Sequence, residues 1–211
     1  MTGLMRKDLL VLRKQLRTYL IFLVIYGALS VAGLFPLAAV AAVIQILMVM
    51  LPISAFSFDE IARWDRYAAA LPGGRRAMVT SRYLFTFLVA LAAAVLGAAT
   101  CLILSRTAGE PVAEGLAAVL ACLGLGLFIA DVLLPLCYKW GVERARPWMY
   151  VVIFVPVLLF VGAWYLGLLD WLNAVPEGAV LFLTAGAALL PFAGMLISWR
   201  ISLAIMERKE L

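Results

Sequence analysis

The amino-acid sequence predicts an all-α integral membrane protein with six transmembrane helices. Of its 211 residues, 66% are hydrophobic and only 14% are charged, whereas soluble globular proteins average about 45–50% apolar and about 25% charged residues. Most of the chain must therefore face lipid. The bilayer core has no water to bond to backbone groups, so only helices and closed barrels can cross it. Apolar runs such as Tyr83–Leu104 are long and do not alternate with polar residues as barrel strands do, which favours helices.

The six spans follow from the length of the apolar windows, since a helix needs about 17–25 residues to cross a bilayer. We expect them at Tyr19–Phe35, Leu37–Phe56, Tyr83–Leu104, Val112–Cys137, Trp148–Leu166 and Ala179–Trp199. Only the turn at Pro36 separates the first two, which indicates a tight helical hairpin. The polar segments are short, so residues 1–211 are expected to form a single transmembrane domain.

The basic residues predict the orientation of these spans. Sixteen of the seventeen Lys and Arg residues fall in residues 1–18, 57–82 and 138–147 and in the tail from residue 200, and the remaining one is Arg106. Cytoplasmic segments of membrane proteins are enriched in Lys and Arg. Both termini and the 57–82 loop are therefore expected in the cytoplasm. This topology accounts for the net charge of +5 without a nucleic-acid partner.

Enzymatic activity is disfavoured by what the sequence lacks. It contains no histidine, which removes the commonest general base and metal ligand. Its three cysteines lie inside apolar runs and lack the close spacing of a metal site. Lys139 and Arg146-Pro147 match the first signature of phosphatidate-type phosphatases, but that chemistry also needs histidines. We expect no catalytic site, no metal and no bound cofactor in this chain.

Residues 1–18 are expected to form an amphipathic helix before the first span. Apolar residues three or four apart form one stripe, and cations gather on an adjoining face. The stripe comprises Met5, Leu9, Leu12, Leu16 and Leu20, and the cations are Arg6, Lys7, Arg13, Lys14 and Arg17. Such a helix lies in the headgroup plane. It could serve as a topology anchor or as an elbow beside a cytoplasmic partner, and amphipathicity does not separate the two.

The cytoplasmic 57–82 loop is expected to contain a short helix over Ser57–Leu71. Ser57 and Glu60 fit a capping box, in which the Ser57 side chain bonds to the backbone N–H of Glu60 and the Glu60 side chain bonds to the backbone N–H of Ser57. Asp59 and Arg63 are spaced as an i,i+4 ion pair with the acid leading. Pro72 and two glycines would then end the helix.

Two aromatic residues in this loop, Trp64 and Tyr67, are flanked by charges. Aromatic residues in a charged setting are typical of a surface that docks a protein partner. The alternative is that both residues merely anchor the loop at the membrane interface.

Three short motifs resemble the permease subunits of bacterial ATP-binding-cassette exporters, in the branch of small, separately encoded permeases with six spans. They are Leu4…Lys7-Asp8-Leu9, then Phe58…Asp59-Glu60…Trp64…Tyr67…Leu71-Pro72…Arg75…Val79…Ser81-Arg82-Tyr83, and finally Pro135…Tyr138-Lys139…Gly141…Arg146. Relatives often carry Ser or another residue between the Pro and the Arg of the second motif. Here that position is Gly73-Gly74, which would loosen the turn.

The resemblance implies a permease that binds no ATP, and the chain contains no Gly-x-x-x-x-Gly-Lys-Ser/Thr phosphate loop. A separate ATP-binding-cassette ATPase would hold ATP-Mg, and two permeases would pair as a homo- or heterodimer in the bacterial cytoplasmic membrane. Ser57–Leu71 would be the coupling helix that rests on the ATPase. The docking residues implied are Asp59, Glu60, Arg63, Trp64, Tyr67 and Arg75.

Asp131 is the one acidic residue deep inside a predicted span, since Glu114 lies at the outer end of the same span. A carboxylate in hydrocarbon is costly, so a functional role in the lumen or at a dimer contact is one interpretation. The other is an interfacial acid that pairs with Lys139 or stays protonated. The sequence thus favours an exporter permease over the alternative, a secondary carrier or channel, because carriers usually need several intramembrane polar groups. An apolar path would fit a lipid, an amphipathic peptide or a hydrophobic drug.

Overall fold

The computed structural model describes residues 2–35, 37–64, 67, 73–108, 112–168 and 177–209. Regular structure in this part of the chain is entirely helical, which confirms the predicted all-α class. The helices are α1 Thr2–Val11, α2 Arg13–Val31, α3 Leu37–Ile61, α5 Gly74–Ala108, α6 Val112–Trp140, α7 Val142–Tyr165 and α8 Glu177–Arg208.

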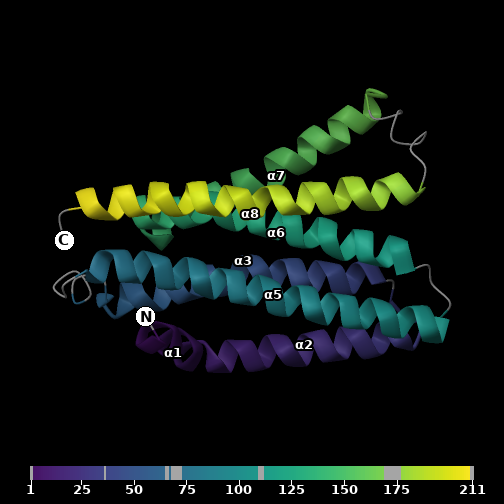
Figure 1. Ribbon diagram of the computed structural model, residues 1–211, viewed down its shortest axis with the longest axis horizontal. Coiled ribbons are helices and arrows are strands. Elements are labelled where there is room, and N and C mark those ends of the chain that lie inside the picture. The colour runs from purple at the N-terminus through teal and green to yellow at the C-terminus, as the bar shows by residue number, and fades with distance from the viewer. Residues whose placement is uncertain are drawn as a thin grey trace.

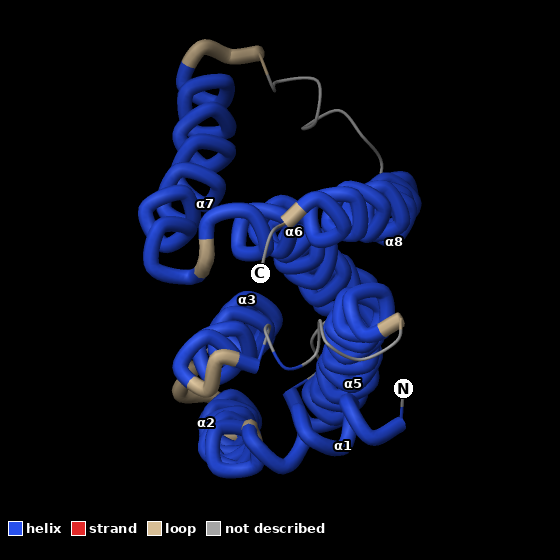
Figure 2. Tube along the Cα trace, turned by 90° about the vertical axis from the view of Figure 1, so that its left-hand side faces the viewer, coloured by secondary structure: helices blue, strands red, loops and turns tan. Residues whose placement is uncertain are grey.

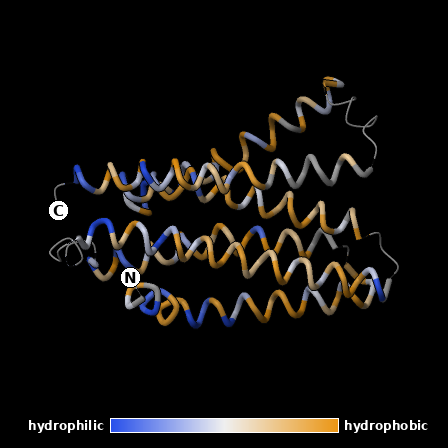
Figure 3. Tube along the Cα trace, viewed as in Figure 1, coloured by the Kyte–Doolittle hydropathy of each residue, from blue (hydrophilic) through white to orange (hydrophobic). Residues whose placement is uncertain are grey.

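The long helices lie side by side with both chain termini at one end, which we call the terminal end (Figure 1). The end of α3 and the start of α5 lie at the same end. Most hydrophilic residues gather there, as the blue segments of α1, α5 and α8 show in Figure 3. The middle of the bundle is apolar, which is the distribution that a bilayer requires.

Five of the described helices contain a segment long and apolar enough to cross a membrane. These segments are Val40–Ile61, Gly74–Arg106, Gly115–Trp140, Val142–Tyr165 and Leu189–Arg208. The helix that covers the first predicted span, α2, is not among them, because it begins with Arg13, Lys14 and Arg17. It nevertheless runs beside α3 and α5 along the bundle (Figure 1).

The amphipathic N-terminal segment is divided into two helices. The chain bends at Leu12, and Figure 2 shows α1 turned across the end of α2. Leu12 is fully buried at this bend, and Leu16 packs beside it against α3 and α5. Leu9 and Leu20, in contrast, are half-exposed. Among the described side chains of the predicted apolar stripe, Leu12 and Leu16 therefore pack against the bundle.

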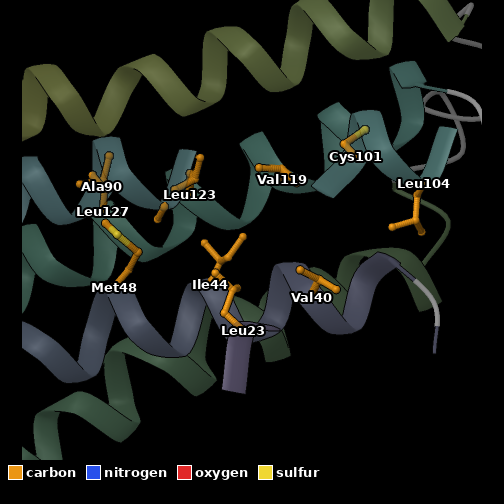
Figure 4. Packing of buried hydrophobic residues seen from close by; sticks show 11 residues of the cluster. Leu23, Val40, Ile44, Met48, Ala90, Cys101, Leu104, Val119, Leu123 and Leu127 are labelled. Atoms are coloured by element: carbon orange, nitrogen blue, oxygen red, sulfur yellow. The ribbon is translucent and has the colours of Figure 1, made fainter. Parts of the chain in front are cut away.

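The apolar core has two main parts. One joins α2, α3, α5 and α6 around Ile44, Met48 and Leu127 (Figure 4). The other lies nearer the terminal end and joins α5, α6 and α8 around Val79, Leu134 and Met206. Because protein interiors are close-packed, the side chains in these two regions set how closely the helices approach one another.

Helix α7 packs least with the rest of the chain. It contacts α6 and α3 through residues near its start, Met149 and Ile153 among them, and then diverges from the bundle (Figure 1). Val142 and Ala145 at its start are buried, but none of the described side chains from residue 146 to residue 165 is. This helix therefore presents most of its apolar surface outward.

Candidate functional site

Four charged side chains from three helices meet at the terminal end and form what we call the charge cluster. Lys7 and Asp8 come from α1, Asp59 from α3 and Arg82 from α5. Lys7 Nζ lies 2.5 Å from Asp59 Oδ1 and 3.3 Å from Asp8 Oδ1. Arg82 binds Asp59 with one guanidinium nitrogen, and its other terminal nitrogen lies 3.3 Å from Asp8 Oδ2. Each acid therefore contacts both bases.

The charge cluster is largely buried, so its ion pairs are little screened by solvent and hold the helices in position. The side chains of Asp8 and Arg82 are only 4% and 3% exposed. Two cations and two anions balance one another, which is the condition under which buried charges are tolerated. The Arg82 guanidinium also lies 4.8 Å from the Phe56 ring centroid, and Lys7 Nζ lies 4.6 Å from that of Trp64. The cluster thus fixes α1 against α3 and α5.

The predicted capping box at Ser57 is wrong. Helix α3 continues without a break through Ser57 to Ile61, so Ser57 lies inside a helix and not at its start. The predicted pair of Asp59 with Arg63 is wrong as well, because Asp59 binds Lys7 and Arg82. The chain leaves the helix after Ile61, and Arg63 adopts a φ of 50°. Of the rest of the predicted Ser57–Leu71 helix, only Trp64 and Tyr67 lie within the described residues.

Glu60 caps a different helix from the one predicted. Its Oε2 accepts a hydrogen bond from the Val142 backbone N–H at 3.0 Å. Val142 is the first residue of α7, and Gly141 before it has no side chain to cap the helix. A carboxylate at a helix N-terminus satisfies a free N–H and complements the helix dipole. Glu60 therefore fixes the start of α7 to the end of α3.

This cap predicts a strict requirement for glycine at position 141. Gly141 has a φ of +78°, and a Cβ there would lie 2.9 Å from Glu60 Oε1. Left-handed backbone costs a residue with Cβ about 1–2 kcal/mol. We expect Gly141→Ala to lower the melting temperature of the solubilised protein. Gly162→Ala in α7 is the matched control, because a Cβ at Gly162 meets nothing within 4 Å. Equal melting temperatures for the two variants would contradict this account of the cap.

The other predicted docking residues are divided between interior and surface. Trp64 is half-buried and packs against the core between α5, α6 and α8. Tyr67 is 61% exposed, with its ring centroid 5.1 Å from that of Trp64. Arg75 donates a hydrogen bond to the Glu207 carbonyl at 2.9 Å and so joins the start of α5 to the end of α8.

An exposed apolar surface lies at the end of α3. Ile61 is 81% exposed and Phe58 is 39% exposed. They are three residues apart and share one side of the helix. The neighbouring Asp59 belongs to the charge cluster, and Glu60 binds the start of α7. Tyr67, six residues after Ile61 in the sequence, is also exposed. We call Phe58, Ile61 and Tyr67 the tip surface.

A chain of hydroxyl groups joins α5 to α6 and α8. Ser198 Oγ donates to the Asp131 carbonyl at 2.6 Å. A hydroxyl has one proton to donate, so the Tyr83 hydroxyl must donate to Ser198, at 2.6 Å, and accept from Ser202, at 2.7 Å. The Asp131 carbonyl is free for this bond because Pro135, four residues later, has no N–H.

The sequence motifs contained residues whose roles were not predicted. Asp8, Arg82 and Tyr83 belong to the motifs and Lys7 is one of the cations of the predicted amphipathic helix, but the sequence does not predict that they contact one another or Asp59. The signal available is position, because Arg82 directly precedes a predicted span and Asp8 is an acid among the basic residues of 1–18. Arg82 and Tyr83 are adjacent on α5 and face different sides of it. Through them α5 connects the charge cluster with the α6–α8 pair.

Long apolar helices in one bundle, with polar residues concentrated at its ends, define a multi-pass membrane protein. The family model described as ABC-2 family transporter protein matches residues 3–207. The chain belongs to this family, and the resemblance to ABC transporter permeases is confirmed. The family implies a membrane component that works with an ATPase subunit. Neither the curated proteins nor the solved structures give a match.

Proposed function

We propose that this chain is the transmembrane permease subunit of an ATP-driven exporter and couples to a separate ATP-binding-cassette ATPase. The observation that carries the proposal is the convergence of Lys7, Asp8, Asp59 and Arg82 in one buried cluster, in a chain of the ABC-2 family. A rigid-body motion of a partner reaches the spans only through a stiff element. The cluster and the Glu60 cap supply that stiffness at the end of α3.

The tip surface is the proposed contact with the ATPase. Ile61 and Tyr67 are exposed and apolar beyond the polar end of the bundle, where a soluble partner would meet them. Apolar and aromatic side chains at the centre of an interface carry most of its binding energy. A push on Ile61 would act on Asp59 and Glu60 within the same helical turn, and through them on α1, α5 and α7. Trp64, which packs between Tyr67 and the core, would hold Tyr67 in place.

The exporter would act as a dimer in the bacterial cytoplasmic membrane. Helix α7 leaves its apolar side chains, such as Phe154 and Leu158, outside the bundle of its own chain. A second permease, identical or homologous, would pack against this helix. Residues 1–18, which comprise α1 and the start of α2, would act as the elbow in the headgroup plane, with Arg13, Lys14 and Arg17 at the cytoplasmic surface.

The proposed orientation predicts which ends of the bundle are accessible from outside the cell. In a variant without the native cysteines, Arg106→Cys should react with an impermeant maleimide in intact cells. Arg146→Cys, at an equally exposed position near the terminal end, should react only after permeabilisation. The reverse pattern would place the tip surface outside the cell and exclude an ATPase contact there.

The function itself is tested by purifying the tagged full-length chain from its native membranes in a mild detergent. We expect an ATP-binding-cassette ATPase to be recovered with it in comparable amount. Recovery of the folded chain without any ATPase would contradict the proposal and favour a secondary carrier or channel.

A further inference from the structure

Helices α6 and α8 form an open apolar groove of about 820 Å³. Its wall on α6 is a stripe at helical spacing through Gly124, Phe128, Asp131 and Pro135, and its wall on α8 is a facing stripe that includes Pro191, Gly194 and Ser198. This volume falls within the range of about 300–1,000 Å³ typical of sites for small molecules.

Asp131 places a carboxyl group in this groove, and no side chain in the described structure pairs with its Oδ2 atom. Its Oδ2 atom is buried and has no hydrogen-bond partner among the described residues. The expected pair with Lys139 does not form, since Lys139 Nζ lies over the Trp140 ring, 5.2 Å from the centroid. An acidic oxygen left without a partner in an apolar region is costly. Asp131 lines the groove, and it is the one acidic residue among the described lining residues with which a ligand can pair.

Three neighbouring features favour a cation with an apolar body. Phe128 is one turn before Asp131 on the same side of α6, and aromatic faces attract cations. Pro191 has no N–H, so the Ala187 carbonyl in the groove lacks its usual helical donor and presents a further partial negative charge. Gly194 packs directly against Asp131 Oδ2, and because it has no side chain, α8 adds no bulk around the carboxyl group.

We propose that the α6–α8 groove binds amphipathic monovalent cations, with the cationic centre at Asp131 and the apolar body along the two helices. Charge complementarity decides between the possible occupants. A neutral lipid would leave the carboxylate unpaired, and an anion would be repelled. A second copy of the chain that packed its own groove against this one would bring no cation to Asp131, because the described groove residues include no Lys or Arg. This inference rests on the proposed export function and specifies its substrate class. The groove would receive the substrate from within the membrane.

Tetraphenylphosphonium and tetraphenylborate provide the test, because they have the same shape and opposite charge. Equilibrium dialysis of the purified full-length chain in nanodiscs would measure the binding of each ion. We expect saturable binding of tetraphenylphosphonium and only non-saturable partition of tetraphenylborate. Asp131→Asn should weaken tetraphenylphosphonium binding about tenfold or more, because a charged contact is exchanged for a neutral one.

A second variant tests the geometry with the charge retained. In Gly194→Ala the new Cβ would lie 2.9 Å from Asp131 Oδ2, so the carboxylate must move from its position in the groove. We expect weaker tetraphenylphosphonium binding for Gly194→Ala. Gly186→Ala on the same helix should bind as wild type, since a Cβ there meets nothing within 4 Å. Size-exclusion profiles would verify that each variant is folded.

Equal tetraphenylphosphonium binding by wild type and Asp131→Asn would overturn the inference. So would the absence of saturable binding to wild type, or equal binding of the two probe ions. The dialysis needs no ATPase, so its result is independent of the proposed coupling. Cation binding without a co-purifying ATPase would support the groove and contradict export, whereas the opposite pair of results would contradict the groove alone.

Discussion

Replacing Arg82 by alanine is expected to lower the free energy of unfolding by about 3–5 kcal/mol, the cost typical of breaking a buried ion pair. Arg82 is 3% exposed in its side chain and contacts both Asp8 and Asp59. Its removal would leave two carboxylates with only Lys7 between them. We expect a lower melting temperature of the solubilised protein, measured by size-exclusion chromatography after heating, and a lower yield from membranes.

Two further variants show whether charge balance is the cause. Arg76→Ala removes an exposed arginine from the same end of α5 and should have little effect. Asp59→Asn combined with Arg82→Gln removes one charge of each sign and leaves the neutral Lys7–Asp8 pair, which are 3.3 Å apart. The double variant should therefore be more stable than Arg82→Ala. An Arg82→Ala protein as stable as wild type would show that the cluster does not hold α1 in place.

The positions of the long helices could be predicted from the sequence because lipid imposes a simple rule. An apolar run of sufficient length must be helical when no water is present to bond to its backbone. Helices α3, α5, α6, α7 and α8 cover the second to sixth predicted spans. The first span is less clear-cut, because the basic residues Arg13, Lys14 and Arg17 belong to the same helix as the apolar run that follows them.

The capping motif at Ser57 predicts a helix start that the structure does not contain, because the motif also occurs inside a continuous helix. Capping matters only where backbone N–H groups lack helical partners. Here the helix of the second span continues past Pro52 and Ser57 to Ile61, so those N–H groups are already bonded. Asp59 and Glu60 were recognised as important residues, but their partners lie elsewhere in the chain.

Those partners could not be read from local spacing. Asp59 binds Lys7, 52 residues away, and Arg82, 23 residues away. Glu60 binds the backbone N–H of Val142, 82 residues away. Such contacts depend on how three or four helices pack, whereas periodicity reports only which side of a single helix is apolar. The groove beside Asp131 could not be predicted from the sequence for the same reason, because it is formed by two helices, α6 and α8.

Removing the tip surface is expected to separate the permease from its ATPase. Ile61 and Tyr67 are 81% and 61% exposed, so their truncation leaves the chain's own core intact. Trp64 is less suitable for this test, because it packs against Val79 and its neighbours in the core. Loss of a central apolar anchor costs an interface about 2 kcal/mol or more, roughly a thirtyfold loss of affinity. The Ile61→Ala, Tyr67→Ala double variant should therefore retain little ATPase.

The matched control places the same chemical change at the opposite end of the bundle. Leu34 and Tyr165 are 69% and 91% exposed at the ends of α2 and α7. A Leu34→Ala, Tyr165→Ala double variant removes a comparable apolar and aromatic pair from the far side of the membrane. It should co-purify with as much ATPase as wild type does.

The most direct test of the coupling claim is the amount of ATPase recovered per permease from membranes that express wild type, the tip variant or the control variant. We predict equal recovery with wild type and the control, and a loss of most of the ATPase with the tip variant, while all three permeases insert and elute as folded protein. Undiminished ATPase recovery with the Ile61→Ala, Tyr67→Ala variant would contradict the assignment of the end of α3 as the coupling surface.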